Sequence, residues 1–289
     1  MKYFLSLLMF WLVFAIGASA QSTTAQKVKF KYKAYWGGFV VAEINSETVL
    51  DASNYETVAN YRVKGVAMIM GKMENRTMAR GILHSDGTYH PEYYESMGNF
   101  GKLIYNNQVT FDPETLYVTD LVQDLKLRKD TEYIPIADEE KYGMDPMTIF
   151  LNMILNQNFK EAYSEEVKTR QFGGMFVSEQ SFICDQTKEF KQESRSVFKG
   201  EAFACKIDGK AISGDIKSTK PRKKRRRGRE RDDQDSRLYF GKMPDFEGTV
   251  PVYTEFPIGW GKVRIYLSEF SVEPIKGSIV TAKNSKADE

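Results

Sequence analysis

The sequence contains few of the residues that build catalytic and metal centres. Its 289 residues include only two cysteines and two histidines. A Ser-His-Asp or Cys-His hydrolase needs a histidine base, and only His84 and His90 could supply one. Both flank the turn signal Ser85–Gly87, where a surface histidine is the ordinary interpretation. A Gly-x-Ser-x-Gly elbow, a P-loop and a dinucleotide fingerprint are also missing. These absences favour a protein that is not an enzyme.

Carboxylates, in contrast, are abundant. The 39 Asp and Glu residues offer too many pairs for the sequence to identify a couple that cleaves glycosidic bonds. A glycan-acting enzyme that uses unidentified carboxylates therefore stays open as an alternative. The cysteines lie far from His84 and His90 in sequence and make no recognised zinc spacing. We expect neither a metal nor a cofactor.

Long hydrophobic runs are absent except at the start of the chain. Lys2 precedes the apolar run Phe4–Ile16, and Ala18–Ala20 has the small-x-small pattern that signal peptidase accepts. The run is shorter than the roughly 20 residues that cross a bilayer. The sequence therefore predicts a signal peptide over residues 1–20, cleavage between Ala20 and Gln21, export, and no transmembrane segment in the mature chain.

Export bears on the expected redox state of the two cysteines. In an oxidising compartment an even pair favours a disulfide, so we expect Cys184 and Cys205 to be bonded to each other. Two buried free thiols are the alternative.

The remaining composition indicates a strand-rich fold, with 42% hydrophobic and 13% aromatic residues. Val28–Trp36 alternates apolar and polar side chains, which is the pattern of a strand with one buried face. Gly37-Gly38 then predicts a hairpin turn into a second strand, Phe39–Val49. Similar alternation recurs along most of the chain, as in Tyr55–Val66, so the sequence predicts an antiparallel meander.

One segment has helical spacing instead. Asp145 is a good N-cap, Pro146 suits the first helical position, and five apolar residues follow on one stripe. The sequence therefore predicts an amphipathic helix over residues 145–156 that covers a sheet. The β-rich stretches 21–140 and 160–275 on either side could be two lobes of one sheet or two domains.

Positive charge is concentrated in one stretch, although the formal net charge is only +2. The basic run consists of Arg222, Lys223, Lys224, Arg225, Arg226, Arg227, Arg229 and Arg231. It has almost no apolar residue to bury, so residues 218–236 are expected to form a disordered loop. Such a charge density suits anionic lipid or polysaccharide. No aromatic residues interleave with the arginines, which argues against nucleic acid. Residues 276–289 form a polar tail.

Several motifs are individually weak, but the order in which they occur is informative. They are the opening strand Tyr35–Glu43, Tyr55 and Tyr61 in the second hairpin, Asp145-Pro146-Met147 at the helix start, Val250-Pro251-Val252, and Gly261–Ile265. In this order the chain resembles the bacterial envelope family known as domain of unknown function 3108. The approach to the late Pro-Val strand departs from the family pattern at Leu238–Met243, and the basic run is an insertion.

The expected fold is all-β or β-rich: a curved antiparallel sheet over residues 21–275 that forms an incomplete barrel, with the one helix packed against it. The expected protein is non-enzymatic, exported, and located in the periplasm. We expect it to bind an apolar or amphipathic envelope component on the curved sheet, such as a lipid or lipoprotein, or another envelope protein. A structural protein that the basic run tethers to anionic envelope polymers is a further alternative.

Overall fold

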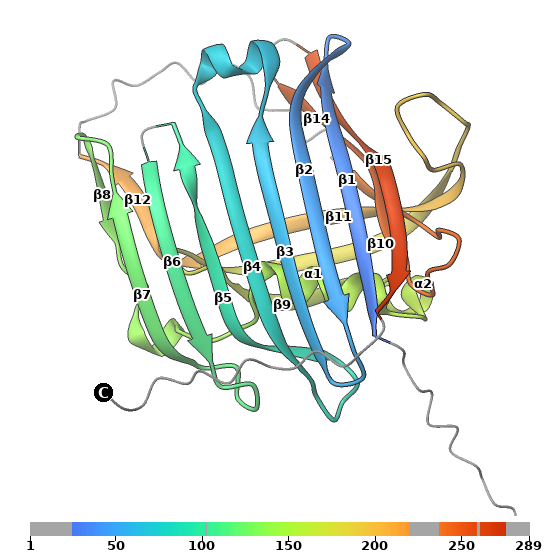
Figure 1. Cartoon of the computed structure of the whole chain (residues 1–289). Coiled ribbons are helices and arrows are strands. Elements are labelled where there is room, and N and C mark those ends of the chain that lie inside the picture. The colour runs from blue at the N-terminus through green and yellow to red at the C-terminus, as the bar shows by residue number, and fades with distance from the viewer. Residues whose placement is uncertain (1–24, 102, 220–236, 259–260, 276–289) are drawn as a thin grey trace, which may run out of the picture.

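Thirteen antiparallel strands form one open sheet in the computed structural model, which describes residues 25–101, 103–219, 237–258 and 261–275 (Figure 1). The strand order is β7-β6-β5-β4-β3-β2-β1-β15-β14-β13-β11-β10-β9. The sheet curves around the main helix, α1, without closing, since β7 and β9 remain at its two edges. The predicted fold class is therefore confirmed.

The strands of the large sheet are β1 (Gln26–Trp36), β2 (Phe39–Leu50), β3 (Asn54–Val63), β4 (Met73–Leu83), β5 (Tyr89–Phe100), β6 (Leu103–Phe111), β7 (Val118–Lys126), β9 (Val167–Phe172), β10 (Val177–Phe190), β11 (Gly200–Ser213), β13 (Arg237–Gly241), β14 (Val250–Ile258) and β15 (Gly261–Pro274). A second, two-stranded sheet pairs β8 (Thr131–Ile134) with β12 (Asp215–Ser218). The helices are α1 (Pro146–Leu155), α2 (Phe159–Ala162) and two 3-10 turns, η1 (Gly65–Met70) and η2 (Asp138–Glu140).

Strand β1 joins the beginning and the end of the chain. It pairs with β2 on one side and with β15 on the other. Strands from both β-rich stretches therefore belong to one large sheet, and β8 and β12 pair separately. The turn from β1 to β2 is the predicted hairpin, because Gly37 and Gly38 adopt φ values of 55° and 92° that other residues rarely tolerate.

One glycine that resembles a turn residue in sequence lies inside a strand. The pair Asp208-Gly209 is typical of a turn, yet β11 runs through both residues to Ser213. A Cβ atom on Gly209 would lie 2.9 Å from Nε2 of Gln180 on the neighbouring strand. The glycine therefore leaves room for a side chain that crosses it, and it makes no turn.

Helix α1 begins where the sequence predicted. Asp145 accepts hydrogen bonds from the backbone N–H groups of Met147 and Thr148 at 2.8 and 3.0 Å, and Pro146 occupies the first turn. The predicted single apolar stripe, however, accounts for only some of the buried residues of the helix. None of the ten helical residues is exposed, and the fully buried ones include Ile149 and Met153, which lie outside that stripe. The helix is enclosed by the sheet, with β4, β5 and β9 against it.

The carboxyl group of Asp145 is fully buried at this helix start. Thr148 donates to it through both its backbone N–H and its hydroxyl group, and the hydroxyl of Tyr55 on β3 contacts the Thr148 hydroxyl in turn. Burial outweighs these hydrogen bonds and raises the pKa of Asp145 from 3.8 to about 6.

This raised pKa predicts a pH-dependent loss of stability. Between pH 3.8 and about 6 the folded chain holds the Asp145 proton more tightly than the unfolded chain does, so the free energy of unfolding falls as the pH rises through that window. The loss should reach about 3 kcal/mol above pH 6. Asp145→Asn keeps the N-cap acceptor and removes the titration.

Urea unfolding of the parent and of Asp145→Asn across this pH range measures the effect. Every other carboxyl group is common to both proteins, so the difference between the two stability curves isolates Asp145. We expect that difference to change by about 3 kcal/mol, in the direction that favours the parent at low pH. Parallel curves would show that folding does not raise the pKa of Asp145.

Candidate functional site

The concave face of the sheet, where the sequence favoured a ligand, is filled by α1. A cavity of about 50 Å³ remains between the helix and strands β1 to β3, lined by residues that include Phe30, Thr48 and Leu151. Sites for small molecules usually have volumes of about 300–1,000 Å³. The space under the helix therefore suits a water molecule, and an acyl chain needs another place.

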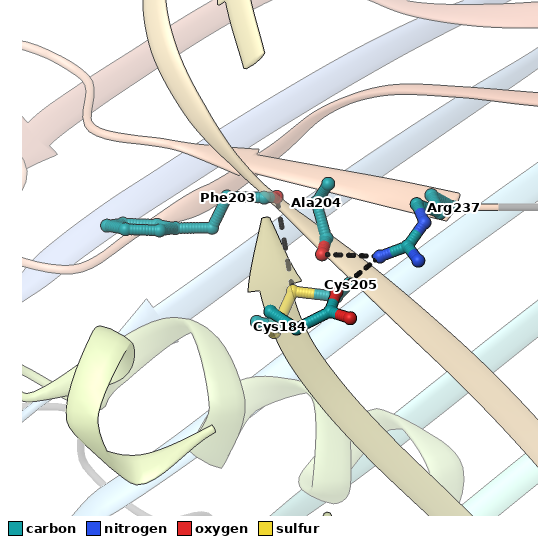
Figure 2. The surroundings of a disulfide bond; sticks show 6 residues. Cys184, Phe203, Ala204, Cys205 and Arg237 are labelled. Carbon is teal, nitrogen blue, oxygen red and sulfur yellow. Dashed lines mark hydrogen bonds and ion pairs between the residues drawn. A yellow bond between two sulfur atoms is a disulfide. The ribbon is translucent and has the colours of Figure 1, made fainter. Parts of the chain in front are cut away.

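A disulfide joins Cys184 on β10 to Cys205 on β11, as the sequence predicted (Figure 2). Both cysteines are buried. The bond lies where the pairing of these two strands is irregular, between Ile183 and Gln186. Figure 2 shows the guanidinium of Arg237 beside the bond, and its Nη1 donates to Oδ1 of Asp185 at 2.5 Å. Burial and pairing make this a structural bond and not a reactive thiol pair.

Exposed apolar side chains gather at one end of the sheet, which lies at the top in Figure 1. They come from the turn after β1, from η1, from the end of β5 and from β14. We call this set the apolar rim. It consists of Phe39, Val66, Met68, Ile69, Phe100 and Phe256. Ile69 is 89% exposed, Phe39 66% and Phe100 65%, whereas large apolar side chains of this kind are usually buried.

Side chains of the 3-10 turn η1 are exposed because of the local backbone geometry. Gly65 adopts φ 58°, and a Cβ atom there would lie 3.0 Å from the Val40 carbonyl oxygen, so the chain turns tightly against β2. Ala67 packs against a small cluster on β1, β2 and β15. Its neighbours Val66, Met68 and Ile69 are left exposed.

An open groove of about 410 Å³ continues the rim past Phe100. Its lining is mainly apolar, with Leu103, Leu127 and Ile216, and its polar members include Arg128 and Thr131. An apolar groove with a cationic residue at its edge suits an amphipathic molecule.

Basic residues surround this end of the sheet. Lys64 and Lys72 flank η1 and form ion pairs with Glu43 and Glu74. Lys126, Arg128 and Lys129 are exposed at the end of β7 and in the turn that follows it, and Lys126 pairs with Ile104 near the β5–β6 turn. These five basic residues border the rim, two of them ion-paired with glutamates, and we call the five the cationic border.

Several predicted site residues lie outside the described part of the chain. The whole basic run, from Arg222 to Arg231, and the cleavage point between Ala20 and Gln21 fall there. So does the polar tail, residues 276–289. The functions expected of these segments stay predictions.

Sequence reasoning missed the apolar rim. A signal was present in Lys64–Lys72, where an apolar stretch stands between two glycines and two lysines. Periodicity assigned residues 55–66 to a strand, and a strand residue was expected to be half-buried. Whether a turn residue is exposed depends on which neighbouring elements pack against it. Hydrophobic periodicity carries no information on those neighbours.

Comparisons with known proteins give structural likeness alone. No protein-family model and no curated protein matches the chain. The chain is similar to the crystal structure of a beta-barrel-like protein of domain of unknown function DUF1849 from Brucella abortus, with 9% identity, a TM-score of 0.48, and coverage of 87% of this chain and 98% of that one. The resemblance to domain of unknown function 3108 stays a prediction. No helix among the described residues is long and apolar enough to span a membrane.

Proposed function

We propose that this chain is an exported, non-enzymatic protein of the cell envelope that binds amphipathic lipid through the apolar rim. One observation carries the proposal: six large apolar side chains are exposed at the same end of the sheet, with Ile69 at 89% the most exposed of them. Contiguous exposed apolar surface marks a place where a protein meets a lipid or a partner. The disulfide is in keeping with an oxidising compartment, and we place the protein in the periplasm.

The cationic border favours a lipid surface over a protein partner. Apolar side chains from several separate turns can enter the headgroup region together, while the lysines and arginines around them meet anionic headgroups. Lys64 and Lys72 stand on both sides of the most exposed segment, η1. The groove beyond Phe100 offers room for part of an acyl chain.

The energy of such a contact comes mainly from Ile69 and its neighbours. Moving a fully exposed isoleucine out of water contributes roughly 1.5–3 kcal/mol, and each 1.4 kcal/mol changes a partition coefficient about tenfold. Replacing Met68 and Ile69 together by Gln should therefore weaken vesicle binding at least about tenfold. Neither substitution changes the charge.

Flotation with vesicles of phosphatidylethanolamine and phosphatidylglycerol measures this loss. The matched control is Val122→Gln, because Val122 is 53% exposed on strand β7, away from the rim. We expect the control to float like the parent and the Met68→Gln/Ile69→Gln variant to stay with the soluble fraction. If parent and rim variant float equally, the rim does not bind lipid. If the parent never floats, a protein partner becomes the better interpretation of the rim.

The basic run makes a second, separable contribution. Deleting Lys220–Arg231 removes almost no apolar side chain, so the melting temperature should barely change. Binding of the deletion variant to anionic vesicles should weaken at low salt and match that of the parent at about 1 M salt, where the Debye length falls to about 3 Å. Equal binding of parent and deletion variant at low salt would remove the basic run from the account.

A further inference from the structure

The opposite end of the sheet brings both histidines of the chain together. His84 follows β4 and His90 lies in β5, on either side of a turn. Their imidazole rings stack with centroids 4.2 Å apart and planes inclined by only 6°. The sequence suggested two surface histidines, but His90 is only 6% exposed, and the His84 side chain is 21% exposed.

Hydrogen bonds to a second turn fix where each ring carries its proton. Nδ1 of His90 lies 2.5 Å from the carbonyl oxygen of Pro113, which can only accept. Nε2 of His84 lies 3.1 Å from the carboxylate of Glu114. In the neutral rings the lone pairs are therefore on Nε2 of His90 and Nδ1 of His84.

Both lone-pair nitrogens face the carboxylate of Asp86. Nδ1 of His84 lies 3.5 Å from Oδ1 of Asp86, and Nε2 of His90 lies 3.6 Å from its Oδ2. The backbone N–H and the hydroxyl of Thr88 both donate to Oδ1, at 2.8 and 2.7 Å. These bonds hold the carboxylate in place and leave Oδ2 free to coordinate.

Nδ1 of His84 is buried and makes no hydrogen bond of normal geometry, since Oδ1 of Asp86 at 3.5 Å is within ion-pair range only. Buried polar atoms without partners are rare in native proteins, and an ion that fills the gap is one of the usual reasons. The unpaired nitrogen points to a ligand at the place where the two histidines and Asp86 meet.

We propose that His84, Asp86 and His90 bind a divalent first-row transition metal ion such as Zn²⁺. The candidate ligand atoms all lie within 4.8 Å of one another. A tetrahedral zinc ion with bonds of about 2.0–2.1 Å separates its ligand atoms by about 3.3 Å. The separations of 3.5 Å between His84 and Oδ1 of Asp86 and of 3.6 Å between His90 and Oδ2 are near that value, one for each carboxylate oxygen. Water completes the fourth position. Two imidazoles and one carboxylate suit zinc and its neighbours better than calcium or magnesium, which prefer oxygen ligands.

The surrounding residues behave as the outer layer of a metal site. Metal-binding histidines commonly donate the N–H of their second ring nitrogen to a carboxylate or a backbone carbonyl. Here the Glu114 carboxylate accepts from His84, and the Pro113 carbonyl accepts from His90. All three ligands come from the β4–β5 hairpin, and these two hydrogen bonds tie that hairpin to the β6–β7 turn. The rival arrangement is a protonated histidine pair that neutralises Asp86 without any metal.

Calorimetric titration of the mature, untagged chain with Zn²⁺ separates the two arrangements. We expect saturation at one ion per chain and a rise in melting temperature with added Zn²⁺. Asp86→Asn should weaken Zn²⁺ binding at least about tenfold, because it removes a charged ligand and keeps the acceptor for Thr88. Co²⁺ in place of Zn²⁺ should give visible absorption of tetrahedral intensity.

The control is Asp51→Asn in the β2–β3 turn at the same end of the sheet. Oδ1 of Asp51 accepts from the backbone N–H groups of Ser53 and Asn54 at 2.8 and 2.6 Å, which is the turn role that Asp86 also has. This variant should bind Zn²⁺ like the parent. Absence of saturable binding to the parent, or equal binding by Asp86→Asn and Asp51→Asn, would overturn the proposal.

Discussion

Leu151→Asp is expected to abolish the cooperative fold at room temperature. Leu151 is 2% exposed in the middle of α1, where the sheet surrounds it. A carboxylate there has no partner, and an unpaired buried charge costs several kcal/mol in addition to the lost apolar contacts. Domains are stable by only about 5–15 kcal/mol, so the substitution consumes most of that margin. Circular dichroism and urea unfolding measure the outcome.

The same chemical change at a surface position provides the control. Leu83 is 40% exposed at the end of β4, so Leu83→Asp should change the free energy of unfolding by less than about 1 kcal/mol. If Leu151→Asp unfolds at the same urea concentration as the parent, α1 is not enclosed by the sheet and the fold described above is wrong.

Removing the disulfide is expected to have the next largest effect. Cys184 and Cys205 are separated by 21 residues, and closing a loop of that size contributes roughly 3 kcal/mol in the chain-entropy model. Replacing both by Ala should therefore lower the free energy of unfolding by roughly 3 kcal/mol, with a further loss where the sulfur atoms leave a gap.

Reduction of the parent gives an independent measurement of the same bond. Thiol counting on the denatured, unreduced chain should find no free thiol, since the described cysteines are both bonded. The reduced parent should then unfold near the Cys184→Ala/Cys205→Ala variant. Two free thiols in the denatured parent would contradict the bond.

Much of the fold was readable from the sequence because local signals and tertiary packing agree. Alternation over Val28–Trp36, the glycine pair at residues 37–38 and the Asp145-Pro146 helix start each specify one local structure, and the sheet uses all three. The sequence signals failed where one residue type occurs for two different structural reasons. Gly209 looks like a turn residue in sequence, but it serves to let Gln180 cross β11.

The candidate sites were less accessible to sequence reasoning. The rim depends on turns that are far apart in the chain, and η1 and Phe100 come to the same end of the sheet because Phe100 on β5 pairs with Met73 at the start of β4, just after η1. The histidine cluster depends on Pro113 and Glu114, which come from another hairpin and settle which ring nitrogen is free. No spacing rule connects such residues, because the register of the sheet sets their proximity.

Quenching of an added tryptophan by brominated lipid shows whether the apolar rim enters the bilayer. Ile69→Trp places an interface-preferring ring at the most exposed rim position, and Val122→Trp places one on β7 as the control. With vesicles whose acyl chains carry bromine, the account predicts a blue shift and stronger quenching for Ile69→Trp than for the parent, and no such difference for Val122→Trp. A tryptophan at position 69 that keeps its aqueous emission while the protein is bound to vesicles would contradict it.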